Sequence, residues 1–222
     1  MLSVILAESS LELIPKSIQN HPSVVSHAKK LEKKPSEILL DNSWHFAAMK
    51  GIDNEHKRGR PDLVHLCLLE ACTIPLYLEN KIMIYLHTID DKVIFVGKGV
   101  RIPKSYHRFE GLIEKLYKEK TIESDGKILL ELKELNFTKL LDHINPKKVI
   151  GLSIEGISNS YQNIASIFDD NYSVVIGGFQ KGHFSELVKN RIDELYCIDK
   201  KSLEAHVVVG RILYEYEKTI FK

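Results

Sequence analysis

The chain has 222 residues, 44% of them hydrophobic, which is enough for a packed core and excludes an intrinsically disordered protein. The 31 basic and 30 acidic residues nearly cancel, so the net charge by itself indicates no nucleic-acid partner. Three cysteines, an odd number without a C-x-x-C pair, argue against a disulfide scaffold or a zinc site.

The start of the chain, MLSVILAESS, predicts a strand and not a signal peptide, because it has no basic leader and its apolar run is short. No apolar stretch approaches the length that spans a bilayer. Ten histidines are scattered without an H-E-x-x-H motif, so we expect no metal site. These features predict a cytoplasmic protein without a membrane partner, built as a single domain over residues 1–222.

The first hundred residues predict a buried strand, several short elements and a β-hairpin. Apolar periodicity, a helix-start proline and turn residues set their limits. The elements are a strand at 3–7, a helix at 22–33, a short strand at 38–40, a helix at 44–49, a polar loop at 51–62, a helix at 62–72 and a hairpin of 81–89 with 93–97.

The rest of the chain alternates strands and helices. Pro103 is expected to open an amphipathic helix that ends near residue 117, residues 121–126 predict a turn, and the last helix spans 202–216. Such alternation is typical of an α/β fold with a mostly parallel, covered sheet. Because the hairpin interrupts it, a segment at about 38–100 is expected to be an inserted hairpin and helix extension. Apolar runs predict the remaining strands at 128–132, 149–154, 174–176 and 195–198.

The stretch VVIGGFQKGHF, residues 174–184, combines an apolar run with three glycines. Gly177, Gly178 and Gly182 have the spacing G-G-x-x-x-G, whereas the dinucleotide fingerprint is G-x-G-x-x-G. Lys181 precedes the last glycine, so this is not a Walker loop, in which the lysine follows it. A plain turn with positive φ and a loop that holds another kind of ligand explain these glycines about equally well.

A second strand-end loop, residues 198–203, comes shortly afterwards. In a parallel sheet it would lie at the same carboxyl edge as the glycine loop, where open α/β sheets bind ligands. The segment offers mostly apolar side chains, which suit a neutral adenosine better than a pyrophosphate. These residues are Leu195, Tyr196, Cys197, Ile198, Leu203 and Ala205.

A basic stretch runs from residue 92 to residue 109 and contains no acid, so it forms a local cationic patch. Arg101 lies in the turn before the helix expected from Pro103, and Lys104 and Arg108 are i, i+4 on that helix. Cations near a helix N-terminus attract phosphate groups. These residues alone favour RNA binding only slightly over an ordinary solvated face. The basic residues are Lys92, Lys98, Arg101, Lys104, His107 and Arg108.

The sequence RGRPD places Arg60 and Asp62 on either side of Pro61. Pro61 fixes the backbone at a helix start, and Asp62 then falls in the first turn, where the helix dipole favours a carboxylate. On one interpretation, the carboxylate of Asp62 only stabilises the start of the helix. On a second interpretation, it also holds the side chain of Arg60 in one orientation toward RNA.

Several other residues carry open interpretations. His183 follows the glycine loop and is a candidate base, although a surface position at a helix start fits it better. Trp44 and Phe46 are expected in the core, and Tyr106 is a candidate for stacking on a base. The apolar residues of the last helix suit a dimer interface and packing on the sheet equally well. They are Val207, Val208, Val209, Ile212 and Leu213.

Four motifs in this order, RGRPDLVH, VRIPKSYHRFEGLIEKLY, GGFQKG and LYCIDKKSL, resemble those of the small-subunit rRNA pseudouridine N1-methyltransferases. These enzymes belong to the SPOUT superfamily and act in ribosome biogenesis. The resemblance extends from the first strand to the last helix. It implies a C-terminal trefoil knot that forms a pocket for S-adenosyl-L-methionine, with S-adenosyl-L-homocysteine as product, and a homodimer.

The resemblance also implies roles for individual residues. Arg60 and Arg101 would stabilise the anion that develops on the target base, with Asp62 orienting Arg60. Arg60, Arg101, Lys104 and Arg108 would contact rRNA, although Lys104 stands where relatives often have arginine and so lacks bidentate geometry. The residues implied in cofactor binding are Ile176, Gly177, Gly182, Leu195, Tyr196, Cys197, Ile198, Asp199, Lys200 and Leu203.

Together these features predict a methyltransferase that modifies N1 of a pseudouridine in small-subunit rRNA, with ribosomal assembly proteins as further partners. A non-catalytic RNA-binding assembly factor for the small subunit is the alternative. A nucleotide-binding α/β protein unrelated to RNA is a third and weaker interpretation.

Overall fold

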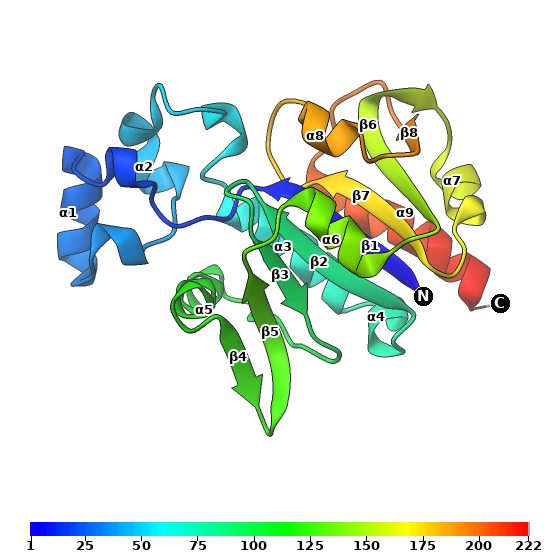
Figure 1. The fold of residues 1–222 in the computed structure, drawn as a ribbon, viewed down its shortest axis with the longest axis horizontal. Helices are drawn as coiled ribbons and strands as arrows, with labels where there is room; N and C mark the ends of the chain where they lie inside the picture. The colour runs from blue at the N-terminus through cyan, green and yellow to red at the C-terminus, as the bar shows by residue number, and fades with distance from the viewer. Residues whose placement is uncertain (222) are drawn as a thin grey trace.

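One eight-stranded sheet forms the centre of the molecule, and the computed structural model describes residues 1–221 (Figure 1). The strand order is β4-β5-β3-β2-β1-β7-β6-β8. The five strands from β2 to β8 in this order are parallel, whereas β3, β5 and β4 pair antiparallel at the other end. The strands are β1 Leu2–Ser9, β2 Ile82–Thr88, β3 Val93–Val96, β4 Thr121–Ser124, β5 Lys127–Lys133, β6 Lys148–Ser158, β7 Tyr172–Gly177 and β8 Glu194–Cys197.

Helices cover both faces of this sheet. Apolar side chains of α3, α4, α5, α7 and α9 form the larger core on one face, and those of α6 and α8 form a smaller core on the other. The helices are α1 Pro22–Leu31, α2 Asn42–Met49, α3 Pro61–Cys72, α4 Pro75–Leu78, α5 Tyr106–Glu119, α6 Phe137–Ile144, α7 Tyr161–Ile167, α8 Glu186–Lys189 and α9 Ala205–Ile220, with 3-10 turns η1 Lys16–Ile18, η2 Pro35–Glu37 and η3 Glu55–Lys57.

Strand β1 is buried along its whole length and contributes to both cores. Leu2, Val4 and Leu6 belong to the larger core, whereas Ile5 and Ala7 belong to the smaller one, as the alternation of side chains along a strand requires. The nearly continuous apolar run at the start of the chain is the sequence pattern of such a doubly covered strand.

A third, separate apolar cluster is formed by α1, α2 and the segments around them, which lie beside one end of the sheet (Figure 1). Val24 and Ala28 of α1 pack here with Ala48 and Met49 of α2. This small cluster holds α2 next to the carboxyl edge of the parallel strands.

The structure confirms the predicted α/β class with a mostly parallel sheet, and most predicted elements. Residues 38–40, predicted as a strand, make only one isolated antiparallel bridge, between Leu13 and Leu39. Residues 121–124 form strand β4 against β5, so the predicted turn is confined to the hairpin tip. Helices α6 and α7 lie in segments for which no element was predicted.

The helix predicted from Pro103 begins three residues later, at Tyr106, with Ser105 as its N-cap. The carbonyl of Pro103 lies 2.6 Å from His65 Nε2, a side chain of α3, so this segment is held by α3 instead of starting α5. Lys104 is therefore not on the helix, and its predicted i, i+4 relation with Arg108 on one helix is wrong.

The β2–β3 hairpin is part of the main sheet, because β2 pairs in parallel with β1. That a segment at about 38–100 is an extension peculiar to this kind of protein stays a prediction, and so does the trefoil knot. Within residues 1–221, no helix has the length and hydropathy of a membrane span.

Candidate active site

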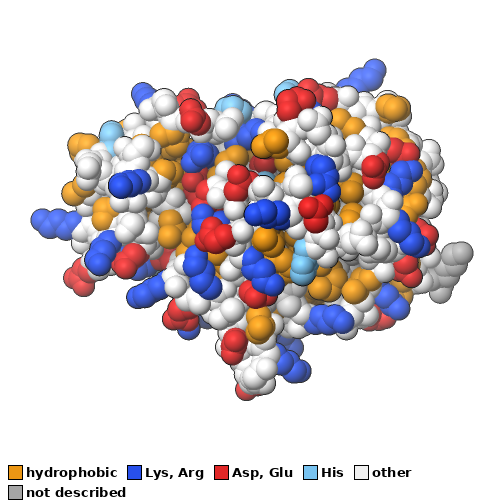
Figure 2. Space-filling model, in the orientation of Figure 1, with side chains coloured by type: hydrophobic (Ala, Val, Ile, Leu, Met, Phe, Trp, Pro, Cys, Tyr) orange, Lys and Arg blue, Asp and Glu red, His pale blue; other side chains and the backbone are white. Residues whose placement is uncertain are grey.

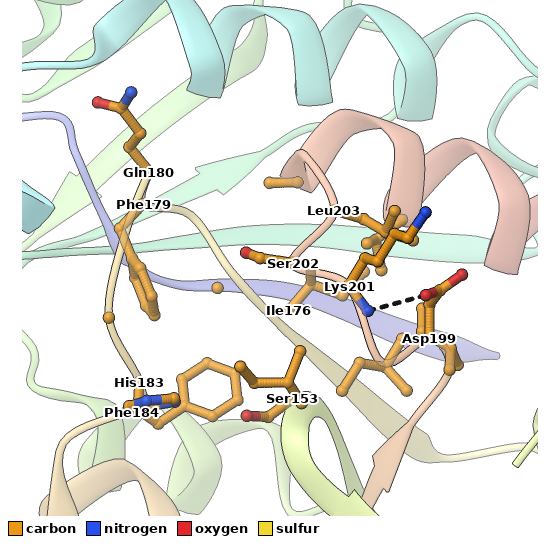
Figure 3. A pocket seen from close by; sticks show the side chains of 17 residues that line it. Ser153, Ile176, Phe179, Gln180, His183, Phe184, Asp199, Lys201, Ser202 and Leu203 are labelled. Carbon is orange, nitrogen blue, oxygen red and sulfur yellow. Dashed lines mark hydrogen bonds between the residues drawn. The ribbon is translucent and has the colours of Figure 1, made fainter. Parts of the chain in front are cut away.

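A cleft opens at the carboxyl edge of the parallel strands, where β7 and β8 end and the pairing of β6 with β7 stops at Leu152 (Figure 3). It encloses about 700 Å³, part of which is open to solvent. Three segments line it: 152–154 within β6, 176–184 at the glycine loop, and 198–208 between β8 and α9. The two loops that the sequence placed at one sheet edge therefore do face one cavity.

The glycine loop is packed tightly on the end of β1. Gly178 donates its N–H to the carbonyl of Ala7 at 2.8 Å, and its own carbonyl accepts from Ser10 N at 2.8 Å. A Cβ at Gly178 would lie 2.3 Å from Ser9 Oγ and 2.8 Å from Ser9 Cα, closer than atoms can approach. Gly182 has a φ of +107°, which favours glycine. The positive-φ turn predicted for these glycines is thus confirmed at Gly182. Gly177 and Gly182 line the cleft, and that the loop holds a ligand stays a prediction.

The loop after β8 is held by its own hydrogen bonds. Lys201 N donates to Asp199 Oδ1 at 2.8 Å, as the dashed line in Figure 3 shows, and Cys197 Sγ donates to the carbonyl of Asp199 at 3.1 Å. These contacts fold residues 199–202 into a turn that presents Ser202 and Leu203 to the cleft.

The cleft is mainly apolar, and its polar groups are few. Lys201 and His183 are its basic side chains within the described part of the chain, so it lacks the paired cations that a pyrophosphate needs. An apolar slot of this kind fits a neutral heterocycle with a small charged tail. The apolar side chains are Leu152, Ile154, Ile176, Phe179, Phe184, Ile198, Leu203, Ala205 and Val208.

Six of the ten predicted cofactor residues line this cleft: Ile176, Gly177, Gly182, Ile198, Asp199 and Leu203. Leu195, Tyr196, Cys197 and Lys200 are not among the lining residues. Leu195 packs into the smaller core, Tyr196 donates its hydroxyl to Glu194 at 2.9 Å, and Lys200 is exposed on the loop. Leu195, Tyr196 and Cys197 lie within β8, which ends at Cys197, whereas the lining of the cleft begins at Ile198, beyond the carboxyl end of the strand.

Sequence reasoning missed the contribution of β6. Leu152, Ser153 and Ile154 line the cleft because β6 lies between β7 and β8 in the sheet. The signal was available, since the predicted strand at 149–154 ends at the same edge of a parallel sheet as the other two. Phe179 and Gln180, which lie within the glycine loop at 174–184, line the cleft as well.

A buried ion pair braces the glycine loop from behind. Lys57 Nζ donates to Glu8 Oε2 at 2.8 Å, and both side chains are only 7% exposed. Lys57 Nζ also lies 4.6 Å from the centroid of the Phe179 ring, and Glu8 accepts from Ser185 N at 3.2 Å. The pair therefore joins β1, the glycine loop and the loop that leads to Arg60.

Arg60 and Asp62 form a bidentate pair at the start of α3. Arg60 Nε donates to Asp62 Oδ1 and Arg60 Nη2 donates to Asp62 Oδ2, both at 2.8 Å. The hydrogen bonds that Arg60 donates to Asp62 raise the pKa of Arg60, and the charges of Asp62, Glu204 and Asp41 raise it further. Arg60 is not among the residues that line the cleft.

The basic stretch is smaller than predicted. Lys92 forms an ion pair with Asp90 at 2.5 Å and lies 3.8 Å from Glu134, so it does not belong to a free cationic patch. Arg101, Lys104 and Arg108 are exposed, and none has a carboxylate within 4.0 Å among residues 1–221. These three cations are therefore available to a ligand.

The two aromatic residues expected in the core are on the surface. Trp44 is 49% exposed and stacks on His27, and Phe46 is 67% exposed. Residues of α2 alternate between the small apolar cluster and solvent, and both rings fall on the solvent side. Tyr106 is half-buried and donates its hydroxyl to Asp41.

His183 lies at the cleft wall, and its Nδ1 is 3.5 Å from Glu155 Oε2. In the last helix, Val208, Val209, Ile212 and Leu213 are buried in the larger core. These four residues therefore pack on the sheet, which was one of the two interpretations. Among the described residues, no group of three or more potential metal ligands lies together.

Comparison with known proteins identifies the chain. Residues 4–217 match the EMG1/NEP1 methyltransferase family. The chain is similar to the ribosomal RNA small subunit methyltransferase Nep1 of Thermococcus sibiricus, with 38% identity over 99% of both chains. It is also similar to the Nep1 of Saccharolobus solfataricus, with 41% identity over 95% of this chain and 94% of the relative.

A solved structure agrees with these relatives. The crystal structure of Archaeoglobus fulgidus Nep1 bound to S-adenosylhomocysteine matches with a TM-score of 0.89 and 34% identity over 99% of each chain. This agreement confirms the family resemblance of the four motifs and the predicted α/β fold with a mostly parallel sheet. From its fold, its cleft and its full-length relatives, this chain belongs to the EMG1/NEP1 methyltransferase family.

Proposed function

We propose that this protein is an S-adenosyl-L-methionine-dependent methyltransferase that methylates N1 of a pseudouridine in small-subunit rRNA. The observation that carries the proposal is the apolar cleft between the glycine loop and the 198–208 segment, in a chain whose fold matches a relative bound to S-adenosylhomocysteine. Full-length relatives are named small-subunit rRNA methyltransferases. With that substrate we also propose a cytoplasmic location.

The cleft fits the cofactor in chemistry. Its apolar walls suit an adenosine, while Ser202 and exposed backbone groups of the two loops offer hydrogen bonds at its edge. Ile176, Gly177, Gly182, Ile198, Asp199 and Leu203 would hold it. S-adenosyl-L-methionine supplies an electrophilic methyl carbon on a sulfonium. The residues of the chain have the task of positioning the base and excluding water.

Methylation joins a carbon to N1 of the base, and the N1 proton must leave. Negative charge develops on the base as this proton is lost, and a nearby guanidinium stabilises it. We assign this task to Arg60, which Asp62 fixes by two hydrogen bonds at the start of α3, with Arg101 as a second cation. The target base must also leave its stack to reach the cleft.

The unpaired cations Arg101, Lys104 and Arg108 would hold the RNA backbone. They lie on the segment before α5 and on its first turn, where phosphate groups are also favoured by the helix N-terminus. Each is exposed and unpaired among the residues described, which supports a role toward a polyanion.

We also propose that the protein acts as a homodimer. Leu66 of α3 and Tyr214 of α9 are large apolar side chains that remain exposed, at 42% and 60%, on two helices that pack together. Covering them with a second copy would remove apolar surface from water. Analytical ultracentrifugation that finds only monomer at micromolar concentration would contradict this.

One experiment separates the enzyme from a non-catalytic assembly factor. A pseudouridine-containing stem-loop from the small-subunit rRNA is incubated with the protein and isotope-labelled S-adenosyl-L-methionine, and the nucleosides are analysed by mass spectrometry. The proposal requires a labelled methyl group on N1 of one pseudouridine. An RNA that binds tightly and gains no mass would favour the assembly factor.

A further inference from the structure

A second cleft lies beside the glycine loop and meets the first at Gln180, which lines both. It is formed by one side of α2, by the loop at 51–58 and by the tip of the glycine loop, and it encloses about 1020 Å³ including space open to solvent. Its lining residues are Asn42, Phe46, Met49, Lys50, Gly51, Glu55, His56, Arg58, Gln180 and Lys181.

Phe46 presents an aromatic ring to this cleft. The ring is 67% exposed, an unusual state for phenylalanine, and it is carried by a helix whose opposite side is anchored by Ala48 and Met49 in the small apolar cluster. Lys50 lies one helical turn later, with Nζ 5.9 Å from the ring centroid. A fixed aromatic ring beside a cation is the arrangement on which proteins stack unpaired bases.

The electrostatics of the cleft favour an anion. Lys50, His56 and Lys181 are exposed, and within residues 1–221 none of them has a carboxylate within 4.0 Å. The acid in the lining, Glu55, already accepts from Gly51 N at 2.7 Å. Arg58 Nη1 donates to Glu12, while its buried Nε has no hydrogen-bond partner in the described part of the chain.

The cleft is joined to the glycine loop by direct packing. A Cβ at Gly182 would lie 2.9 Å from His56 Nε2 and 3.3 Å from Lys57 Cε, so the loop at 51–58 and the glycine loop touch. An RNA strand whose target base enters the first cleft would therefore run directly past the second cleft. An apolar partner would match the ring but not the unpaired cations, so the surface favours RNA over a protein.

We propose that this second cleft binds an unpaired nucleotide adjacent to the methylated one, with its base on Phe46 and its phosphate at Lys50 and Lys181. The proposal rests on the proposed function, since it takes the RNA to be the substrate of the first cleft. It adds a subsite that contributes affinity and sequence context and that does not touch the cofactor.

The test compares Phe46→Ala, Lys50→Ala and Lys181→Ala with the wild type. RNA affinity is measured by fluorescence anisotropy on the stem-loop at several salt concentrations, and S-adenosylhomocysteine affinity is measured by calorimetry. Phe46→Ala should weaken RNA binding about tenfold, the usual effect of losing one stacked base. Each lysine variant should lower the slope of log affinity against log salt by about 0.7, the value for one phosphate on a single strand. Cofactor affinity should not change.

Two variants serve as matched controls. Leu78→Ala removes an equally exposed apolar side chain on α4, and Lys139→Ala removes an exposed lysine on α6. Both should bind the RNA as the wild type does. Circular dichroism spectra identical to the wild type exclude a folding defect in each variant.

Stem-loops with an abasic site at each flanking position locate the bound nucleotide. For one of these abasic RNAs, the affinity for the wild type should be about tenfold lower than that of the intact RNA. For Phe46→Ala, the abasic RNA and the intact RNA should bind with equal affinity, because the stacking contact is already lost. RNA binding by Phe46→Ala within about twofold of wild type overturns the subsite while leaving the methyltransferase intact. A wild-type protein that binds S-adenosylhomocysteine but no RNA overturns both proposals.

Discussion

Lys57 and Glu8 form an ion pair of 2.8 Å from which water is almost excluded. Glu8, the next-to-last residue of β1, has a φ of 51°, a left-handed conformation that is uncommon for residues other than glycine, asparagine and aspartate. That conformation directs the carboxylate to Lys57 and to Ser185 N on the far side of the glycine loop. The pair therefore braces the back of the glycine loop, which lines the proposed cofactor cleft, and Lys57 lies three residues before Arg60.

Replacing Lys57 by methionine should leave the Glu8 carboxylate buried without a counter-charge. Breaking a buried pair in this way costs about 3–5 kcal/mol, so the free energy of unfolding should fall by that amount and cofactor affinity should fall with it. Urea unfolding and calorimetry measure the two effects. Lys115→Met, which breaks the exposed pair with Glu119, is the control and should cost less than about 1 kcal/mol.

The double variant Glu8→Gln, Lys57→Met tests the cause of that loss. With both charges removed, much of the stability should return, because the penalty comes from the uncompensated carboxylate. Equal losses in Lys57→Met and Lys115→Met would show that the buried pair does not brace the site.

Gly178→Ala should damage the cofactor cleft, because the new Cβ would lie 2.3 Å from Ser9 Oγ and 2.8 Å from Ser9 Cα. Either β1 or the glycine loop must shift, so S-adenosylhomocysteine affinity should fall by about tenfold or more. Gly111→Ala, in the interior of α5 with nothing within 4 Å of the new methyl group, is the matched control. It should keep its affinity and gain up to about 1 kcal/mol of stability from helix propensity. Unchanged affinity in Gly178→Ala would mean that the loop does not form the binding site.

Asp62→Ala should release Arg60 from its fixed orientation. We expect a loss of about 1–3 kcal/mol in transition-state stabilisation, measured as kcat/KM on the stem-loop, with S-adenosylhomocysteine affinity unchanged. Arg60→Lys keeps the positive charge but cannot form the bidentate hydrogen bonds of a guanidinium, so it should lose activity to a similar extent. If Arg60→Lys retains full activity, bidentate orientation is not required and the role given to Asp62 is wrong.

The small cluster around α1 and α2 should lose stability in acid. Burial, and then the neighbouring His27, lower the pKa of His45 to about 4. Asp41 N donates to His45 Nδ1 at 3.0 Å, so a proton on Nδ1 would face another donor. The unfolded chain takes up this proton near pH 6.5, whereas the folded chain resists until about pH 4. The contribution of neutral His45 to the free energy of unfolding is therefore fully present above pH 6.5. It is lost as the pH falls toward 4, and the loss amounts to up to about 3 kcal/mol.

Urea unfolding at pH 7 and at pH 4.5 checks this, with His45→Gln as the variant that cannot titrate. The pH dependence should be smaller in His45→Gln than in the wild type, and unaltered in His107→Gln, which changes an exposed histidine. A wild-type stability that rises between pH 7 and pH 4.5 would contradict the lowered pKa.

Local sequence signals predicted the parts of the site that are close together in the chain. The glycines at 177–182 and the turn at 198–203 follow apolar strands, so their place at one edge of the sheet followed from the parallel topology alone. Pro61 and Asp62 marked a helix start that the structure shows. The sequence could not fix the end of β8 to the residue: the strand predicted at 195–198 ends at Cys197, and the lining of the cleft begins at Ile198.

Contacts between distant residues were beyond such reasoning. The Glu8–Lys57 pair joins residues 49 positions apart, and nothing local marks a lysine as buried. Phe46 was expected in the core because most phenylalanines are there, and only the packing of α2 shows otherwise. The start of α5 at Tyr106 was missed since a proline fixes its own φ but does not choose between helix and turn.

The central position of β1 has a consequence for synthesis on the ribosome. Val4 pairs with Ile84 on one side and with Val174 on the other, about 170 residues later. At translation rates of about 5–20 residues per second, the nascent strand waits roughly ten to thirty seconds for its second neighbour. During that interval the β7-facing edge of β1 stays without its native partner, so the central sheet can close only after most of the chain has been synthesised.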